Sequence, residues 1–185
     1  MKLAKPRLEP LQADQWNDAV RDIMKPMLAR GEVFNIFKTL AHHPDLMRRW
    51  LVFGNHILFK STLPAREREL LILRIGWLCQ AEYEWGQHVR IGLQAGLTKE
   101  EIHRIKAGPD AAGWNERDQV LLKATDELHK EAHISDATWQ GLSKHYNTQQ
   151  LMDIVFTVGQ YNLVSMALNT LGVQLDEGLP TFANT

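Results

Sequence analysis

The segment from Asn147 to about Leu171 carries apolar side chains on almost every side of the helix that its spacing predicts. Asn147 is a favourable residue for the N-cap of that helix. A helix that is apolar all round has to be buried, either at the centre of a domain or between subunits. The sequence therefore predicts that residues 147–171 form a central or an interfacial helix.

The rest of the chain also repeats apolar residues at helical spacing, and Gly, Pro or cap residues separate the repeats. No window shows the strict alternation of a half-buried strand. Pro26 is expected to interrupt the first helix, Pro64 to begin another, and Thr98 and Glu101 to form a capping box. We expect an all-α bundle of about eight helices in a single domain spanning 1–185. The other helices are predicted over 14–25, 34–43, 45–60, 64–78, 82–95, 98–108, 115–130 and 135–145.

Charge and composition argue against several classes of protein. The 185 residues include 21 basic and 22 acidic ones, so the net charge of −1 provides no field for nucleic acid or an anionic membrane surface. Cys79 is the single cysteine, so neither an intrachain disulfide nor an all-cysteine zinc site is expected. No apolar run approaches the roughly 20 residues that span a bilayer, and residues 1–12 lack the apolar stretch of a signal peptide. We expect a cytoplasmic protein.

Glu84 and His88 are the residues best placed for chemistry. They are four apart in a predicted helix, so they lie one above the other, on the face that also holds Ala81 and Ile91. A carboxylate and an imidazole on an apolar face are costly to bury unless they pair, and pairing raises the pKa of the histidine. Such a pair suits a general acid or base. A purely structural ion pair has the same spacing, and the pattern alone leaves both interpretations open.

Glu69 and Arg74 lie in the apolar helix that precedes this one. Glu69 could reach the same pocket, because the two helices must pack side by side. Arg74 could neutralise a carboxylate or hold a substrate anion. The alternative is that Glu69 and Arg74 pair with each other across about one helical turn.

Three motifs give the chain a family resemblance. Over about 34–171 it resembles the carboxymuconolactone decarboxylase family, which also contains alkylhydroperoxidase D. The resemblance implies an all-helical fold that assembles into homo-oligomers such as dimers, trimers or hexamers. The resembling segments are Leu-Pro-Ala-Arg-Glu-Arg-Glu-Leu at 63–70, Tyr-Glu-Trp-Gly-Gln-His at 83–88 and Gly-Leu-Thr-Lys-Glu-Glu-Ile at 96–102.

The peroxidase branch of this family uses a Cys-x-x-Cys-x-x-x-His motif and a glutamate one helix earlier. The resemblance places the histidine at His88 and the glutamate at Glu69, but Ala81 and Glu84 stand at the two cysteine positions. Dithiol peroxide reduction needs one thiolate to attack and a second thiol to resolve the sulfenic acid, and neither residue supplies one. Cys79 precedes the motif and is expected to be a small buried core residue.

The decarboxylase branch also lacks the cysteine pair and keeps a histidine at the position of His88. The resemblance therefore implies a lyase that performs acid/base chemistry, either decarboxylation or lactone proton transfer, on a small organic acid without a cofactor. We expect His88, Glu84 and Glu69 to be catalytic. The residues expected to bind the substrate are Arg74, Tyr83 and Trp85.

Alternatives remain at the level of the sequence. The chain could be an alkylhydroperoxidase-like antioxidant protein, or an oligomeric scaffold that has lost its chemistry. His129 and His133 are four apart, near Asp126, and could bind a metal, or they could face solvent as favourable cations at a helix C-terminus. Glu84, His88 and Glu69 could also hold a metal, but we rank proton transfer higher and expect no metal site.

Overall fold

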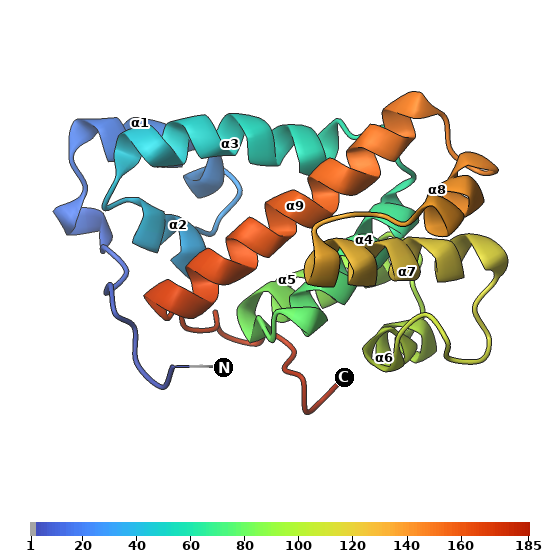
Figure 1. Cartoon of the computed structure of the whole chain (residues 1–185). Helices are drawn as coiled ribbons and strands as arrows, with labels where there is room; N and C mark the ends of the chain where they lie inside the picture. Colours follow the sequence, from blue (N-terminus) through green and yellow to red (C-terminus); the bar gives the residue numbers. More distant parts are fainter. Residues whose placement is uncertain (1–2) are drawn as a thin grey trace.

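The computed structural model describes residues 3–185, and within that range it contains nine α-helices, one short 3-10 turn at Ala13–Gln15 and no strand (Figure 1). The all-helical fold expected from the sequence is confirmed. The helices are α1 (Asp18–Leu28), α2 (Asn35–Leu40), α3 (Pro44–Phe59), α4 (Ala65–Leu78), α5 (Glu82–Gln94), α6 (Lys99–Ala107), α7 (Glu116–Glu131), α8 (Asp136–Ser143) and α9 (Thr148–Leu171).

Cap residues set most of the helix boundaries. The Thr98–Glu101 capping box begins α6 as predicted, and the Asn147 side chain accepts a hydrogen bond from the backbone of Gln150 at the start of α9. Two prolines behave differently from the prediction. Pro64 is the N-cap of α4 rather than its first residue, because its backbone is extended. Pro26 lies inside α1, which continues for two more residues to Leu28.

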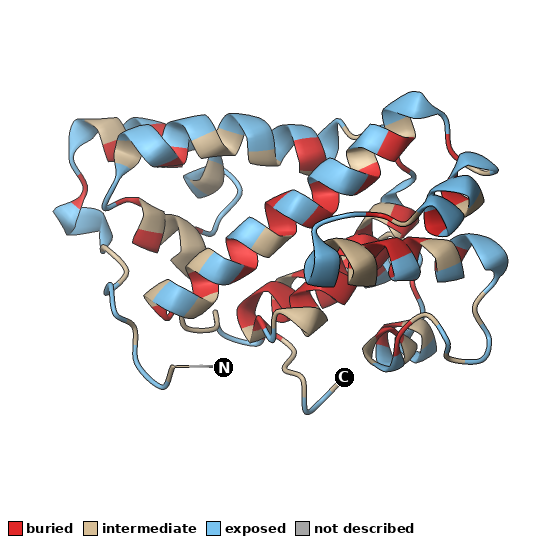
Figure 2. Cartoon of the chain, in the orientation of Figure 1, coloured by how far each residue is buried: buried red, intermediate tan, exposed pale blue. Residues whose placement is uncertain are grey.

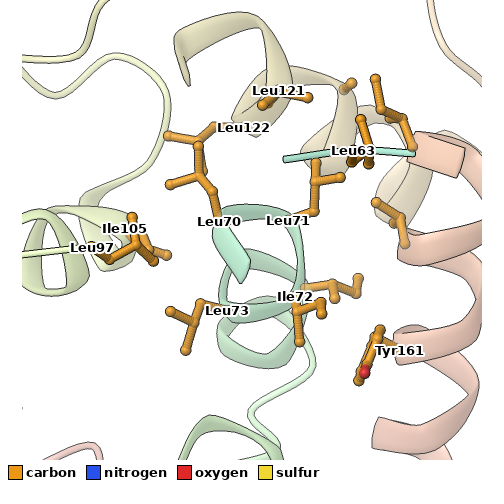
Figure 3. Close-up of a cluster of buried hydrophobic side chains, with 14 of the residues drawn as sticks. Leu63, Leu70, Leu71, Ile72, Leu73, Leu97, Ile105, Leu121, Leu122 and Tyr161 are labelled. Carbon is orange, nitrogen blue, oxygen red and sulfur yellow. The ribbon is translucent and has the colours of Figure 1, made fainter. Parts of the chain in front are cut away.

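Helix α4 is the buried centre of the molecule. Nine of its 14 residues are buried, and it packs against α5, α7 and α9. Figure 2 shows the buried residues concentrated where these helices meet. In the core, four consecutive apolar side chains of α4 point toward different neighbours (Figure 3). Leu70 and Leu71 lie on the side of Leu121 and Leu122. Ile72 points toward Tyr161, and Leu73 points toward Leu97 and Ile105.

Helix α9 runs diagonally across the molecule, between α1–α3 on one side and α4–α8 on the other (Figure 1). By length and composition alone it is apolar enough to cross a membrane, yet 50% of its most apolar window is buried against the protein, as in the core helix of a folded domain. Its other side leaves apolar side chains exposed. We call these the α9 stripe, and its members are Met152, Val155, Phe156, Leu163 and Met166.

Residues 172–185, here called the C-terminal strap, run back over α5. Asp176 accepts hydrogen bonds from the Tyr83 hydroxyl at 2.5 Å and from the backbone N–H of Asn35 at 2.9 Å. Further along, Phe182 packs edge-on against Trp77, with ring centroids 5.0 Å apart, and tilted against Trp85. The strap therefore joins α2, α4 and α5.

Gly86 of α5 leaves room for the strap, since a Cβ built there would come 2.6 Å from the carbonyl oxygen of Pro180. We expect Gly86→Ala to lower the free energy of unfolding by about 1–3 kcal/mol, because the strap has to move. The strap's departure should also red-shift the fluorescence of Trp85. Thermal melting and emission spectra measure both effects.

Gly54 of α3 provides the matched control, because a Cβ there would meet its neighbours at an ordinary 3.5 Å or more. Gly54→Ala should be neutral, or stabilising by up to about 1 kcal/mol, since alanine favours the helix. If both variants had the same free energy of unfolding and the same Trp85 emission, the position of the strap would not depend on having glycine at residue 86.

Candidate active site

Glu69, Glu84 and His88 form one buried cluster between α4 and α5. The Nδ1 atom of His88 lies 2.6 Å from Oε2 of Glu69, and its Nε2 atom lies 2.9 Å from Oε1 of Glu84. All three residues are buried, and Glu69 is 0% exposed. The contact of Glu84 with His88 across one helical turn is present, as the spacing predicted, and Glu69 reaches the same histidine from the neighbouring helix.

The two carboxylates control the charge of His88. Burial by itself would lower the pKa of the imidazole, but the negative charges of Glu69 and Glu84, together with the hydrogen bond to Glu69, outweigh it and raise the pKa to about 10. His88 is therefore an imidazolium at neutral pH. Its Nδ1–H bond to Glu69 fixes the orientation of the ring, because the Glu69 side chain is itself fully buried in α4.

The carboxylate of Glu84 is less completely hydrogen-bonded than that of Glu69. Oε1 of Glu84 is close enough to His88 for an ion pair, yet it completes no hydrogen bond within the described chain. A 2.9 Å separation without a hydrogen bond means that the oxygen lies away from the N–H direction. A charged donor and a charged acceptor thus face each other with their hydrogen-bonding capacity partly unused.

Two further residues border the cluster. Arg68 donates from Nε to Oε1 of Glu69 at 3.1 Å, so Glu69 is held from two sides. The ring of Tyr161, from α9, stands edge-on to the His88 ring with centroids 4.8 Å apart. In the sequence, Tyr161 stands out only as one of a few polar residues in an apolar helix. Arg68 lies in a segment of alternating charges, so its contact with Glu69 could not be distinguished in the sequence from other possible ion pairs.

Arg74 does not join the cluster, although it was expected to bind the substrate. Its guanidinium forms two hydrogen bonds with the Asp126 carboxylate, at 2.6 and 2.7 Å, and a third with the carbonyl of Ile105. It does not pair with Glu69 either. Arg74 lies on a side of α4 that faces α7, and its bonds tie α4 to α6 and α7.

Tyr83 and Trp85, also expected to bind the substrate, form their hydrogen bonds with the strap and not with the cluster. Tyr83 is bound to Asp176 of the strap. Trp85 donates its indole N–H to the Thr185 hydroxyl at 2.9 Å and packs under Phe182. The structure thus gives both residues a role in holding the strap.

His129 and His133 do not share a helical face. Helix α7 ends at Glu131, and Ala132 adopts a left-handed conformation, so the i, i+4 relation is lost. Residues 3–185 contain no group of three or more side chains arranged to hold a metal ion.

Cys79 is half-buried rather than a core residue. It is the C-cap of α4, and its thiol donates to the side-chain oxygen of Asn162 at 3.1 Å. It lines an open cavity of about 590 Å³, together with His129 and Met166 among others.

The raised pKa of His88 predicts how stability depends on pH. A group whose pKa is higher in the folded state stabilises the protein fully below its unfolded value, about 6.5, and loses that contribution as pH rises toward 10. Urea unfolding of the wild type should therefore show stability falling over this range, with a slope approaching one proton. His88→Gln should remove that slope. His103→Gln, at an exposed position of α6, should keep it, and equal slopes in wild type and His88→Gln would contradict the assignment.

Comparison with solved structures supports the fold. An alkylhydroperoxidase AhpD core, an uncharacterized peroxidase-related protein from Ralstonia eutropha JMP134, is 21% identical, with 93% of each chain covered and a TM-score of 0.83. An uncharacterized peroxidase-related protein from Silicibacter sp. TM1040 is 17% identical over 95% of this chain and 94% of its own, with a TM-score of 0.81. The debrominase Bmp8 is 14% identical over 92% of both chains, with a TM-score of 0.75.

No curated protein matches the sequence. Residues 44–127, however, match the model of the carboxymuconolactone decarboxylase family. This range runs from the start of α3 to near the end of α7 and contains all three members of the buried cluster. This match and the shared fold support the family resemblance expected from the sequence, with residues 44–127 as the part of the chain that carries it.

Proposed function

We propose that this protein is an enzyme that transfers protons on a small organic acid in the cytoplasm, in a decarboxylation or a lactone reaction. In this proposal His88 and Glu84 exchange protons with the substrate, and Glu69 positions His88. The family match narrows the chemistry without fixing it, since similar folds occur in peroxidase-related proteins and in a debrominase.

The observation that carries the proposal is the incomplete pairing of His88. One ring nitrogen is held by Glu69 at 2.6 Å, while the other faces a Glu84 oxygen that completes no hydrogen bond. A purely structural ion pair is expected to satisfy both partners, because buried polar atoms without hydrogen bonds cost about 1–3 kcal/mol each. The unused capacity at Nε2 and Oε1 supports a site that a substrate completes.

The charge state of His88 favours proton delivery. With its pKa raised to about 10, the imidazolium is the acid form at neutral pH. In a decarboxylation, the bond between the substrate carbon and its carboxylate breaks, carbon dioxide leaves, and the electron pair stays on the substrate. Nε2 of His88 then gives its proton to that carbon, and a proton from water restores the imidazolium.

Peroxidase chemistry has weaker support. The chain has one cysteine, whereas the dithiol mechanism consumes two thiols. Cys79 caps the end of α4, and its thiol is engaged by Asn162.

Substitution of the two central residues tests the proposal. His88→Gln and Glu84→Gln should each lower turnover roughly 10²–10⁴-fold, because each removes a proton donor or acceptor while keeping the side-chain shape. The substrate is to be found by screening small lactones and carboxylic acids, with release of carbon dioxide and loss of ultraviolet absorbance as readouts.

Thermal melting of the same variants separates catalysis from structure. If His88 has a structural role only, His88→Gln leaves buried carboxylates without their partner, and the cost of about 3–5 kcal/mol appears as lost stability. A variant that melts at a much lower temperature but retains its turnover would contradict the catalytic assignment. His103→Gln serves again as the exposed control.

We also propose that the protein is a homo-oligomer, because the α9 stripe exposes five large apolar side chains along one helix. Sedimentation at micromolar concentration should give at least a dimer. Phe156→Glu should shift the population toward monomer, whereas Trp139→Glu, at an exposed aromatic residue of α8, should not. A monomeric wild type would count against the proposal.

A further inference from the structure

The hydroxyl of Tyr161 is an unused hydrogen-bond donor beside the cluster. Tyr161 is 7% exposed, and no hydrogen bond to its hydroxyl is formed within the described chain. Of the other two tyrosines, Tyr83 donates its hydroxyl to Asp176 at 2.5 Å, whereas the hydroxyl of Tyr146, near the Glu67 carboxylate, also completes no hydrogen bond within the described chain. Buried phenols normally find a partner, so an unpartnered one in contact with His88 is informative.

The surroundings of Tyr161 keep this donor protonated. Burial, followed by the negative charges of Glu84 and Glu69, raises the pKa of the phenol well above its usual value, against a smaller opposite effect of Arg68. The hydroxyl is therefore protonated and able to donate a hydrogen bond at neutral pH. It cannot itself serve as a base.

The charges around this donor balance one another. Glu69 and Glu84 contribute two negative charges, and Arg68 and the His88 imidazolium contribute two positive ones. A small anion that approaches Tyr161 thus meets a site without net charge. The ring contact brings the phenol O–H into the neighbourhood of a second donor, the partly used Nε2–H of His88.

We propose that Tyr161 is a substrate-binding residue whose hydroxyl donates a hydrogen bond to a negatively charged oxygen of the substrate, next to His88. The proposal rests on the proton-transfer function and adds to it the residue that binds the substrate oxygen, which carries or gains negative charge as the proton moves. Such a donor stabilises developing charge best when it is fixed in advance, as the packing of α9 against α4 and α5 fixes this ring.

Acetate provides a minimal probe, because it presents the same oxygen chemistry without a reaction. The full-length protein is labelled with ¹⁵N-histidine, and the His88 signals, assigned by their loss in His88→Gln, are followed during titration with acetate at constant ionic strength. We expect the His88 signals to shift with acetate and not with chloride. Tyr161→Phe should weaken acetate binding tenfold or more, the effect of losing a hydrogen bond to a charged group.

Tyr146→Phe is the matched control, since it also removes a buried phenol oxygen, but beside Glu67 and Arg117 rather than His88. It should leave acetate binding unchanged. Tyr161→Phe should melt close to wild type, because the lost oxygen forms no hydrogen bond in the protein.

The assignment of Tyr161 is overturned if acetate binds equally well to the wild type and to Tyr161→Phe. It is also overturned if the His88 signals of the wild type do not shift with acetate. Neither result touches the proton-transfer proposal, which fails separately if His88→Gln and Glu84→Gln retain full turnover. Weakened binding in Tyr161→Phe alone supports the assignment.

Discussion

The contact between Glu69 and His88 is the interaction around which the site and the core are arranged. A carboxylate that is 0% exposed needs a partner, and the 2.6 Å bond to the imidazole supplies one. The same requirement applies to the other charges that α4 carries into the interior. Glu67 pairs with Arg117, and Arg74 pairs with Asp126, both on α7. Each pair fixes the rotation of α4 against a neighbour, which apolar packing alone would specify less sharply.

This arrangement explains how far the sequence could predict the molecule. Helical spacing and cap residues located the helices to within a few residues, because both are local properties of the chain. The Glu84–His88 contact was predictable for the same reason. Arg74 was misplaced since its partner, Asp126, lies 52 residues away, and no local pattern shows which of several helices an inward-facing guanidinium will meet.

Tyr83 and Trp85 show a second limit of sequence reasoning. They neighbour Glu84 in sequence, but successive residues in a helix point about 100° apart, so neighbours in a motif need not share a site. Their true partners lie in the strap, which has no helical periodicity to reveal it. Conversely, the most apolar helix is not the most buried one. Helix α9 leaves its stripe exposed, while α4, with five charged residues, forms the centre.

The strap has a consequence for how the chain is made. Its contacts close very long loops, since Trp85 and Thr185 are separated by 100 residues, and Asn35 and Asp176 by 141. A ribosome delivers α5 long before residues 172–185 emerge, and during that interval the aromatic surface of Trp77 and Trp85 has no cover from Phe182. The nascent chain thus carries an uncovered aromatic surface until residues 172–185 have been made, and it depends on that segment to bury it.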